Sequence, residues 1–368
     1  MHHDDVHLPQ DCIEVLDWDH ADVPGGYEGY SHVSRASIDL PISSDLLYFL
    51  GRGTLSHGVV RFVDSGATGA SVANVNVTFL YDGYRLSDSL KICRLHKEGS
   101  KNGVGIFSPE VVHHLWNLHS MVVIEVTLPR SAAIKSLETF LPLFSHEVAD
   151  FQDSVTFGSL ALKSANMPIV AKYVATQRTN LQTSNSHISG IFVSNESIDI
   201  STSNSFIEGN FYLSNDGVSS TPSRINLHTS NSRIRARISL TSTAENHRNG
   251  SFNITTETNN SPLNVQFDTA PVDSRVTFIG RTTNSPISAK LHDSFEGTFS
   301  VTTGRWFEAG VHVVNTQDPS GRGRQRYVSR GVSQHGHSEG KVTWGDAGGR
   351  RLGHAELSTT NSPAQLYL

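Results

Sequence analysis

Apolar and polar residues alternate with a period of two in short runs along most of the chain. Before residue 150 such runs occur at 59–63, 75–81, 103–107 and 121–129. This period places the aliphatic side chains on one face of a β-strand. Only residues 109–119 are compatible with a helix, and then a short one. We therefore predict an N-terminal region of antiparallel β-structure over residues 41–150 that forms a sandwich-like cap.

A six-residue motif, Thr-x-Asn-Ser-x-Ile, recurs through the second half of the chain. An alternating strand precedes each copy and a second one follows it, as at 224–228 and 287–291. The spacing between copies varies, which is typical of a constant structural unit with connections of different length. The copies are centred on Asn185, Asn204, Asn231, Asn260, Asn284 and Asn361, with weaker copies at Asn166 and Gly304.

This order of strand, corner and strand predicts an all-β protein whose residues 151–368 form a β-solenoid with one continuous core. The Asn, or Gly304, lies at the corner, where a positive φ can be required. Stacked Asn and Thr side chains could also form hydrogen-bonded ladders between successive corners. The alternative is a β-sandwich in which Asn-Ser is a favoured hairpin turn.

Two segments lack the strand pattern. Residues 1–40 are polar and acidic, and we expect a disordered tail, unless Trp18, Tyr27 and Tyr30 tether it to the domain. Residues 317–340 are rich in Gly, Arg, Ser and His, and we expect a long loop. Strand character resumes at 342–344 and again at 365–368, so the solenoid is predicted to reach the C-terminal residue.

Composition narrows the class of protein. The 368 residues are 37% hydrophobic and only 17% charged, with a net charge of -6. Neither the charge nor the sequence pI of about 6.3 is typical of a dedicated nucleic-acid binder. No segment resembles a signal peptide or a membrane span, so a cytoplasmic location is the default and an extracellular one stays open. Five Asn-x-Ser/Thr sequons argue mildly for an extracellular location. Because chance sequons are expected in a chain this rich in Asn, Ser and Thr, we give them little weight. They are at Asn76, Asn195, Asn249, Asn253 and Asn259.

The chain has two cysteines, Cys12 and Cys93. They are far apart in sequence, and Cys12 belongs to the segment expected to be a tail. We predict two unpaired thiols, with a single disulfide as the alternative.

The repeat resembles that of adhesin-like β-solenoid domains of unknown function, which occur in bacteria and fungi. The stretch Asn102–Phe107, Asn-Gly-Val-Gly-Ile-Phe, before the repeats makes the fungal members the closer match, and the resemblance covers residues 45–368. Bacterial members usually read Thr-x-Ser-Gly-Asp-Ile, whereas this chain has Asn-Ser or Asn-Ser-Pro. The resemblance implies a solenoid and brings no catalytic or binding residues with it.

No constellation of residues predicts a reaction. A polysaccharide-cleaving solenoid needs clustered carboxylates, about 5–10 Å apart, and the acidic residues here do not recur at one repeat position. His113, His114 and His119, or His335 and His337, lack the further ligands of a metal site. We therefore predict no catalytic, cofactor-binding or metal-binding residue. The acidic residues in question are Asp199, Glu208, Asp268, Asp273, Asp293, Glu296 and Glu308.

Two features could serve interactions. The expected loop carries Arg322, Arg324, Arg326 and Arg330, which could contact phosphates or an acidic partner, although a solvated loop is the simpler interpretation. The final strand, Ala364–Leu368, is expected to leave an edge for self-association.

The leading functional hypothesis is a non-enzymatic, adhesin-like scaffold that contacts protein or glycan surfaces, with no specific nucleic-acid binding and no membrane span. A carbohydrate-active β-helix enzyme, or a structural protein without a ligand, are the alternatives.

Overall fold

The computed structural model describes residues 6–23, 25, 27, 29–82, 86–110, 119–218, 221–331, 335–345 and 352–368. These residues contain 27 strands and one short helix, α1 (Leu86–Ser89). No helix in the described ranges is long and apolar enough to cross a membrane. The chain forms two compact units: unit 1 is Met1–Thr176 with Asn180–Ser186, and unit 2 is Gln177–Thr179 with His187–Leu368.

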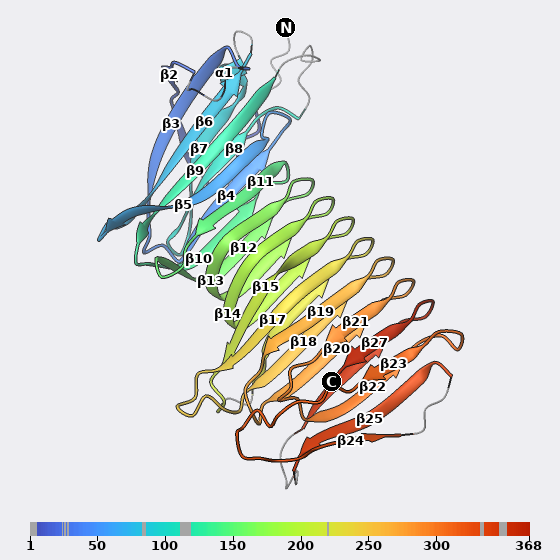
Figure 1. Ribbon diagram of the computed structural model, residues 1–368. Coiled ribbons are helices and arrows are strands. Elements are labelled where there is room, and N and C mark those ends of the chain that lie inside the picture. The colour runs from blue at the N-terminus through green and yellow to red at the C-terminus, as the bar shows by residue number, and fades with distance from the viewer. Residues whose placement is uncertain are drawn as a thin grey trace. The chain divides into compact units, whose positions relative to one another are not determined.

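Unit 2 is a solenoid in which each coil gives one strand to each of two rows of parallel strands (Figure 1). The predicted all-β solenoid is therefore confirmed. In spatial order, the first row is β14 (Ile188–Ser201), β16 (Ser223–His228), β18 (Ser251–Glu257), β20 (Arg275–Arg281), β26 (Gly353–Ser358) and β22 (Gly297–Thr302). The second row is the first half of β14, then β15 (Ile207–Asn215), β17 (Ile234–Ser242), β19 (Leu263–Thr269), β21 (Ile287–Lys290), β27 (Ala364–Tyr367) and β23 (Ala309–His312).

The core of unit 2 lies between the two rows. Alternate residues of β16 and β17 are buried, among them Ile225, Leu227 and Ile234. The Phe267 and Phe278 rings, one from each row, meet edge to face with centroids 5.3 Å apart. Burial of each such side chain contributes about 1.5–3 kcal/mol, and it requires a neighbouring coil above and below.

The spatial order of the coils differs from their order in sequence. The last coil, β26 and β27, lies between the coil of β20 and β21 and the coil of β22 and β23. Figure 1 shows β27 between β21 and β23. β27 is hydrogen-bonded on both edges, and Leu368 is buried. The prediction that Ala364–Leu368 forms an exposed edge is wrong, because the position of a strand in the chain does not determine its position in a sheet.

The outer edge of β22 is covered by a hairpin. β25 (His337–Trp344) pairs antiparallel with β22, and β24 (Arg326–Arg330) pairs antiparallel with β25. Residues 317–340 thus contain two strands where the sequence predicted a loop. The many Gly, Ser, Arg and His residues obscure the period-two alternation there. Backbone pairing with the edge of β22 stabilises strands that the local sequence does not predict.

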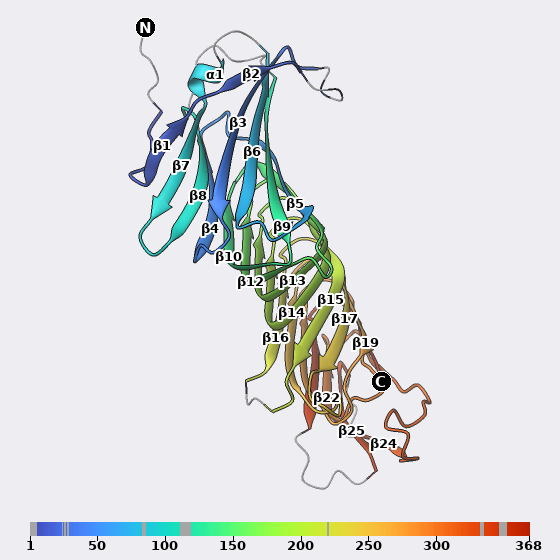
Figure 2. The ribbon, with the colours of Figure 1, turned by 90° about the vertical axis from the view of Figure 1, so that its left-hand side faces the viewer.

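Unit 1 combines parallel coils with antiparallel strands. Its two parallel rows begin before residue 151, and antiparallel strands extend each row (Figure 2). One row is β12 (Val155–Lys163), β10 (Ala132–Phe140), β4 (Leu46–Arg52) and β8 (Lys101–Phe107), continued antiparallel by β7 (Lys91–Lys97) and β1 (Cys12–Leu16). The other is β13 (Ile169–Gln182), β11 (Phe144–Asp150), β5 (Gly58–Thr68) and β9 (Ser120–Arg130), continued antiparallel by β6 (Val72–Tyr81), β3 (His32–Pro41) and β2 (Asp19–Ala21).

The segment expected to be a disordered tail contains β1, β2 and most of β3. Its aromatic residues hold it in place. Trp18 donates from Nε1 to the Leu90 carbonyl at 3.1 Å, and its ring centroid lies 5.9 Å from that of Phe79. Tyr27 and Tyr30 pack against a buried apolar cluster. The tether left open at the sequence level is therefore the arrangement observed.

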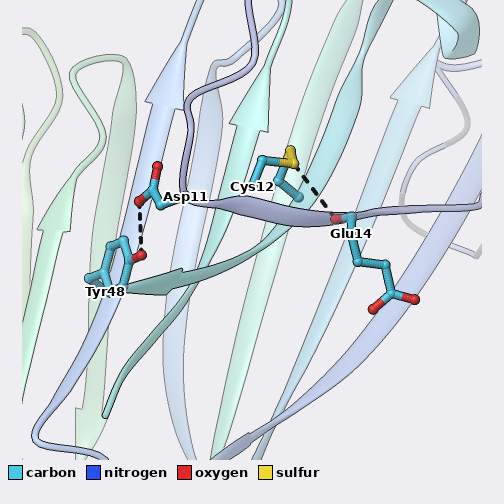
Figure 3. The surroundings of a disulfide bond; sticks show 5 residues. Asp11, Cys12, Glu14 and Tyr48 are labelled. Atoms are coloured by element: carbon cyan, nitrogen blue, oxygen red, sulfur yellow. Dashed lines mark hydrogen bonds between the residues drawn. A yellow bond between two sulfur atoms is a disulfide. The ribbon is translucent and has the colours of Figure 1, made fainter. Parts of the chain in front are cut away.

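A disulfide joins Cys12 of β1 to Cys93 of β7, so the prediction of two unpaired thiols is wrong (Figure 3). The two cysteines are 81 residues apart in sequence, but antiparallel pairing brings their Cα atoms to 5.4 Å. Beside the bond, the Tyr48 hydroxyl donates to the Asp11 carboxylate at 2.9 Å. Burial and this carboxylate raise the pKa of Tyr48 above its ordinary value.

Reduction of this disulfide is expected to loosen β1 without unfolding the rest of unit 1. β1 then depends on pairing with β7 alone, because the cross-link no longer restricts the unfolded strand. Hydrogen exchange of the Cys12–Leu16 amides should rise after treatment with a reductant, and Cys12→Ala should reproduce the rise in non-reducing buffer. The β3 amides are the internal control. Equal exchange of β1 in both redox states would contradict the cross-link.

Leu366→Ala is expected to destabilise the last coils of unit 2 by about 2–4 kcal/mol, the usual cost of such a cavity in a core. Leu366 is fully buried in a strand paired on both edges. Protection of β21 and β23 amides from hydrogen exchange should fall accordingly. Lys290→Ala, at an exposed position of the neighbouring strand β21, is the control. An unchanged protection in Leu366→Ala would mean that the C-terminal strand lies at a frayed edge.

Candidate interaction surfaces

The corner asparagines form hydrogen-bonded ladders. Five side-chain amides donate to the side-chain oxygen of an asparagine in an adjacent coil, and these asparagines are exposed at the surface. In unit 1, Asn185 donates to Asn166 at 2.6 Å. In unit 2, the bonds are Asn231 to Asn204 at 2.9 Å, Asn260 to Asn231 at 2.8 Å, Asn284 to Asn260 at 2.8 Å and Asn361 to Asn284 at 2.7 Å.

The first threonine of the motif has a second stacking role. Thr229 and Thr258 are fully buried, and each hydroxyl donates at 3.0 Å to a corner carbonyl of the adjacent coil. The backbone N–H of Asn260 donates to the Ser230 carbonyl in the same way. The motif therefore supplies hydrogen-bond donors that bind backbone carbonyls of the neighbouring corner, so these carbonyls are not left without a partner.

The corners do not use a positive φ, which corrects the expected reason for Asn. Among the described residues, the non-glycine positions with positive φ are Ser100, Ser131, Asp153, His247, Asn249 and Asp273, and no corner asparagine is among them. Gly304 is explained by close approach, since a Cβ there would lie 2.2 Å from the Thr360 carbonyl oxygen.

The arginines of the proposed interaction loop mostly serve the structure of unit 2. Arg324 lies against Asp318, with Nη2 to Oδ1 at 2.9 Å, and its Nη1 is 3.8 Å from the buried Glu296. Asp318 also accepts N–H bonds from Ser320 and Arg322. The Arg324 hydrogen bond, more than any other contact, lowers the pKa of Asp318 far below its usual range. This pair fixes the turn before β24.

Arg326 and Arg330 protect the end of the second row. Arg326 donates to the Val314 carbonyl at 3.2 Å, and Arg330 donates to the Val311 carbonyl at 3.0 Å. Burial lowers the pKa of Arg326, whose guanidinium lies 5.7 Å from the centre of the Trp344 ring. Blocking of edge carbonyls by charged side chains is a common defence against strand addition. Arg322 and Arg330 are exposed, whereas Arg324 and Arg326 are partly buried.

The histidine pairs do not form a metal centre in the described part of the chain. No group of three or more His, Cys, Asp or Glu side chains there could hold a metal ion. His337 lies 3.1 Å from the Thr302 hydroxyl and 3.4 Å from the Glu339 carboxylate. His113 and His114 lie outside the described residues.

A basic surface, absent from the sequence-level predictions, lies on the outer side of the second row. Arg233, at the corner before β17, and Arg235 and Arg237 within β17 alternate with buried residues, so all three side chains point outward. Their spacing along the strand is about 7 Å between neighbours. We call Arg233, Arg235, Arg237 and the exposed Tyr212 of β15 the β17 face.

Ion pairs anchor the arginines of the β17 face. Glu208 accepts from Arg233 at 3.4 Å and from Arg235 at 3.2 Å. Asp268 accepts two bonds from Arg237, at 2.9 and 3.2 Å. The Arg237 pKa is raised, chiefly by the Asp268 hydrogen bond, with a smaller contribution from Tyr212. Three arginines thus share two carboxylates, which leaves a local excess of one positive charge in an acidic chain.

A stacked column borders the face at the corners. The variable residue before the motif isoleucine occupies this column, and it is His187, Phe206 and Arg233 in three successive coils. The Phe206 ring lies between the His187 ring, at 4.7 Å and 8°, and the Arg233 guanidinium, at 4.7 Å. Both sides of Phe206 are therefore occupied, whereas Tyr212 is 41% exposed.

A polar cavity of about 600 Å³ lies among the loops of unit 2 at the other end of these strands. It contains two carboxylates, Glu196 and Asp216, and two arginines, Arg178 and Arg224. Glu196 pairs with Arg178 at 2.6 Å, and both side chains are about half exposed. A general acid for glycoside cleavage needs a carboxyl group kept protonated by burial, and an ion-paired, solvated Glu196 is the opposite case.

Four of the remaining acidic residues named in the sequence analysis are engaged in structural contacts: Asp199, Asp273, Asp293 and Glu296. Their partners come from neighbouring coils or from the C-terminal hairpin. Asp199 accepts from Asn226, Asp273 from Arg248, Asp293 from Thr316, and Glu296 from the Trp344 backbone N–H.

The β17 face could have been found in the sequence. Residues 233–238 read Arg-Ile-Arg-Ala-Arg-Ile, and the same period of two that predicts the strand places all three arginines on one side. The acidic partners are not readable in this way, because Glu208 and Asp268 come from separate coils.

Comparisons with known proteins give only distant similarity. No protein-family profile and no curated protein sequence matches the chain. The structure is similar to a putative cell adhesion protein from Clostridium sporogenes, with TM-score 0.21 and 7% identity over 91% of this chain and 99% of that one. It is also similar to a putative adhesin from Parabacteroides merdae, with TM-score 0.30 and 14% identity over 69% of this chain and 95% of that one.

Asn260→Ala is expected to lower the free energy of unfolding by about 1–2 kcal/mol, because it removes one ladder bond to Asn231 and one from Asn284. Asn264→Ala, an exposed asparagine on the adjacent strand, is the matched control and should stay within about 0.5 kcal/mol of wild type. Urea unfolding followed by circular dichroism provides the measurement. Equal stability of the two variants would show that the ladder contributes nothing.

Proposed function

We propose that the chain is a non-enzymatic, adhesin-like solenoid that binds a protein or glycan surface through the β17 face. The observation that carries this proposal is the outward row of three arginines with an exposed tyrosine, on a rigid sheet whose own edges are paired or capped. Arg and Tyr are the residue types most enriched where surfaces bind partners. The repeat, with its resemblance to fungal adhesin-like domains, supports the same class.

A non-reducing location forms part of the proposal and replaces the cytoplasmic default. Its support is the disulfide between Cys12 and Cys93, since disulfides persist mainly in oxidising environments. The five sequon asparagines all have exposed side chains, which is compatible with passage through a glycosylating compartment.

The ion pair of Glu196 in the polar cavity argues against glycan cleavage by this residue. Glu196 is ion-paired and solvated. The two carboxylates next to the β17 face, Glu208 and Asp268, are likewise paired with its arginines. Binding therefore fits these surfaces better than catalysis.

The test is binding of the full chain to a panel of immobilised extracellular polymers: collagen, mucin, chitin, mannan and polygalacturonate. Biolayer interferometry should detect at least one interaction that weakens tenfold or more in the triple variant Arg233→Ser, Arg235→Ser, Arg237→Ser. Arg224→Ser with Arg275→Ser, two exposed arginines of the first row, is the control and should bind like wild type. Binding to none of these polymers, or equal binding by the triple variant, would overturn the proposal.

A further inference from the structure

The β17 face offers one particular combination of groups, an exposed aromatic ring next to guanidinium groups. We propose that Tyr212, Arg235 and Arg237 form a subsite for an acidic glycan, in which a sugar ring lies on Tyr212 and its carboxylate is bound by the two arginines. This inference rests on the proposed function and specifies the chemical class of the ligand.

The register of the sheet places Tyr212 beside Arg237, and Arg235 lies two residues farther along the same face. Tyr212 is opposite Ser239, so its outward neighbour along β17 is Arg237, two residues before Ser239. Diagonal neighbours of this kind are within reach of long and aromatic side chains. Arg235 precedes Arg237 by two residues on the same face. A ring of one sugar unit over Tyr212 would therefore bring its substituents to the arginine row.

The side chains of Arg235 and Arg237 are more exposed than those of their acidic partners. The Arg235 and Arg237 side chains are 58% and 60% exposed, whereas those of Glu208 and Asp268 are 37% and 25% exposed. An approaching ligand meets the guanidinium groups first. A guanidinium has five N–H donors, and Arg235 uses one on Glu208 while Arg237 uses two on Asp268. The remaining donors suit a bidentate carboxylate.

Tyr212 supplies the part of the site that is not electrostatic. Its ring is exposed, and tyrosine combines an apolar ring face with a polar hydroxyl. Sugar rings have apolar C–H faces and polar edges, so they match that combination. Phe206 has neither side available, which leaves Tyr212 as the ring of this face that a ligand can cover.

A glycan is favoured over a nucleic acid by charge density. Nucleic acids are bound by proteins with extended basic surfaces and several stacking rings. This chain has a net charge of -6, and the β17 face has one exposed ring and a small positive excess. A uronic-acid polymer carries its charges on sugar rings, one carboxylate at a time, and suits the three groups better.

The test is isothermal titration of the full chain with polygalacturonate and with its fully methyl-esterified form, which has the same backbone without the charge. Wild type should bind the acid at least tenfold more tightly than the ester, and a rise from 50 to 300 mM NaCl should weaken binding. Arg235→Gln with Arg237→Gln should lose tenfold or more, and Tyr212→Ala at least fivefold. Arg224→Gln with Arg275→Gln is the control and should stay within twofold of wild type.

Circular dichroism and thermal melting of every variant separate lost binding from lost folding. Equal affinity for acid and ester, with the double variant still impaired, would overturn the acidic class while leaving the β17 face as a binding surface. Tighter binding of single-stranded oligothymidylate than of polygalacturonate would overturn the glycan in favour of a nucleic acid. No effect of any face variant on any bound polymer would overturn both this inference and the function it rests on.

Discussion

Backbone pairing between adjacent coils is the interaction on which the rest of unit 2 depends. Each coil has two short parallel strands whose inward faces are aliphatic, and neither strand can be satisfied within its own coil. The corner motif reinforces the same pairing, since Thr donors, Asn amides and backbone N–H groups all reach the neighbouring corner. Side chains on the outer face are then free to vary, and the surface of unit 2 differs from coil to coil.

A stack of parallel strands must end, and the ends account for much of the irregular sequence. In unit 2 the hairpin of β24 and β25 covers the edge of β22. Arg326 and Arg330 donate hydrogen bonds to the Val314 and Val311 carbonyls, just after and in β23. In unit 1 antiparallel strands extend both rows, and the disulfide holds the outermost one, β1. In the arginine-rich segment, Arg326 and Arg330 thus protect an edge, and Arg324 pairs with carboxylates of unit 2.

The β17 face differs from these arginines in where its charges point. Arg324 is enclosed by carboxylates with 15% of its side chain exposed, whereas Arg235 and Arg237 extend beyond their acidic partners into solvent. Surface ion pairs of this sort contribute little to stability, typically below about 1 kcal/mol. Packing and stability alone therefore do not account for this arginine row.

The class of fold can be read from the sequence, because period-two alternation and the Thr-x-Asn-Ser-x-Ile motif are encoded in neighbouring residues. The same local pattern was sufficient for the strands at 75–81 and 121–129 and for the asparagine stacking. Tertiary structure alone decided the insertion of β26 and β27, the pairing of Cys12 with Cys93 and the partners of each arginine. Those features join residues far apart in the chain, and strands can pair whatever their separation in sequence, so the local pattern does not identify the partner.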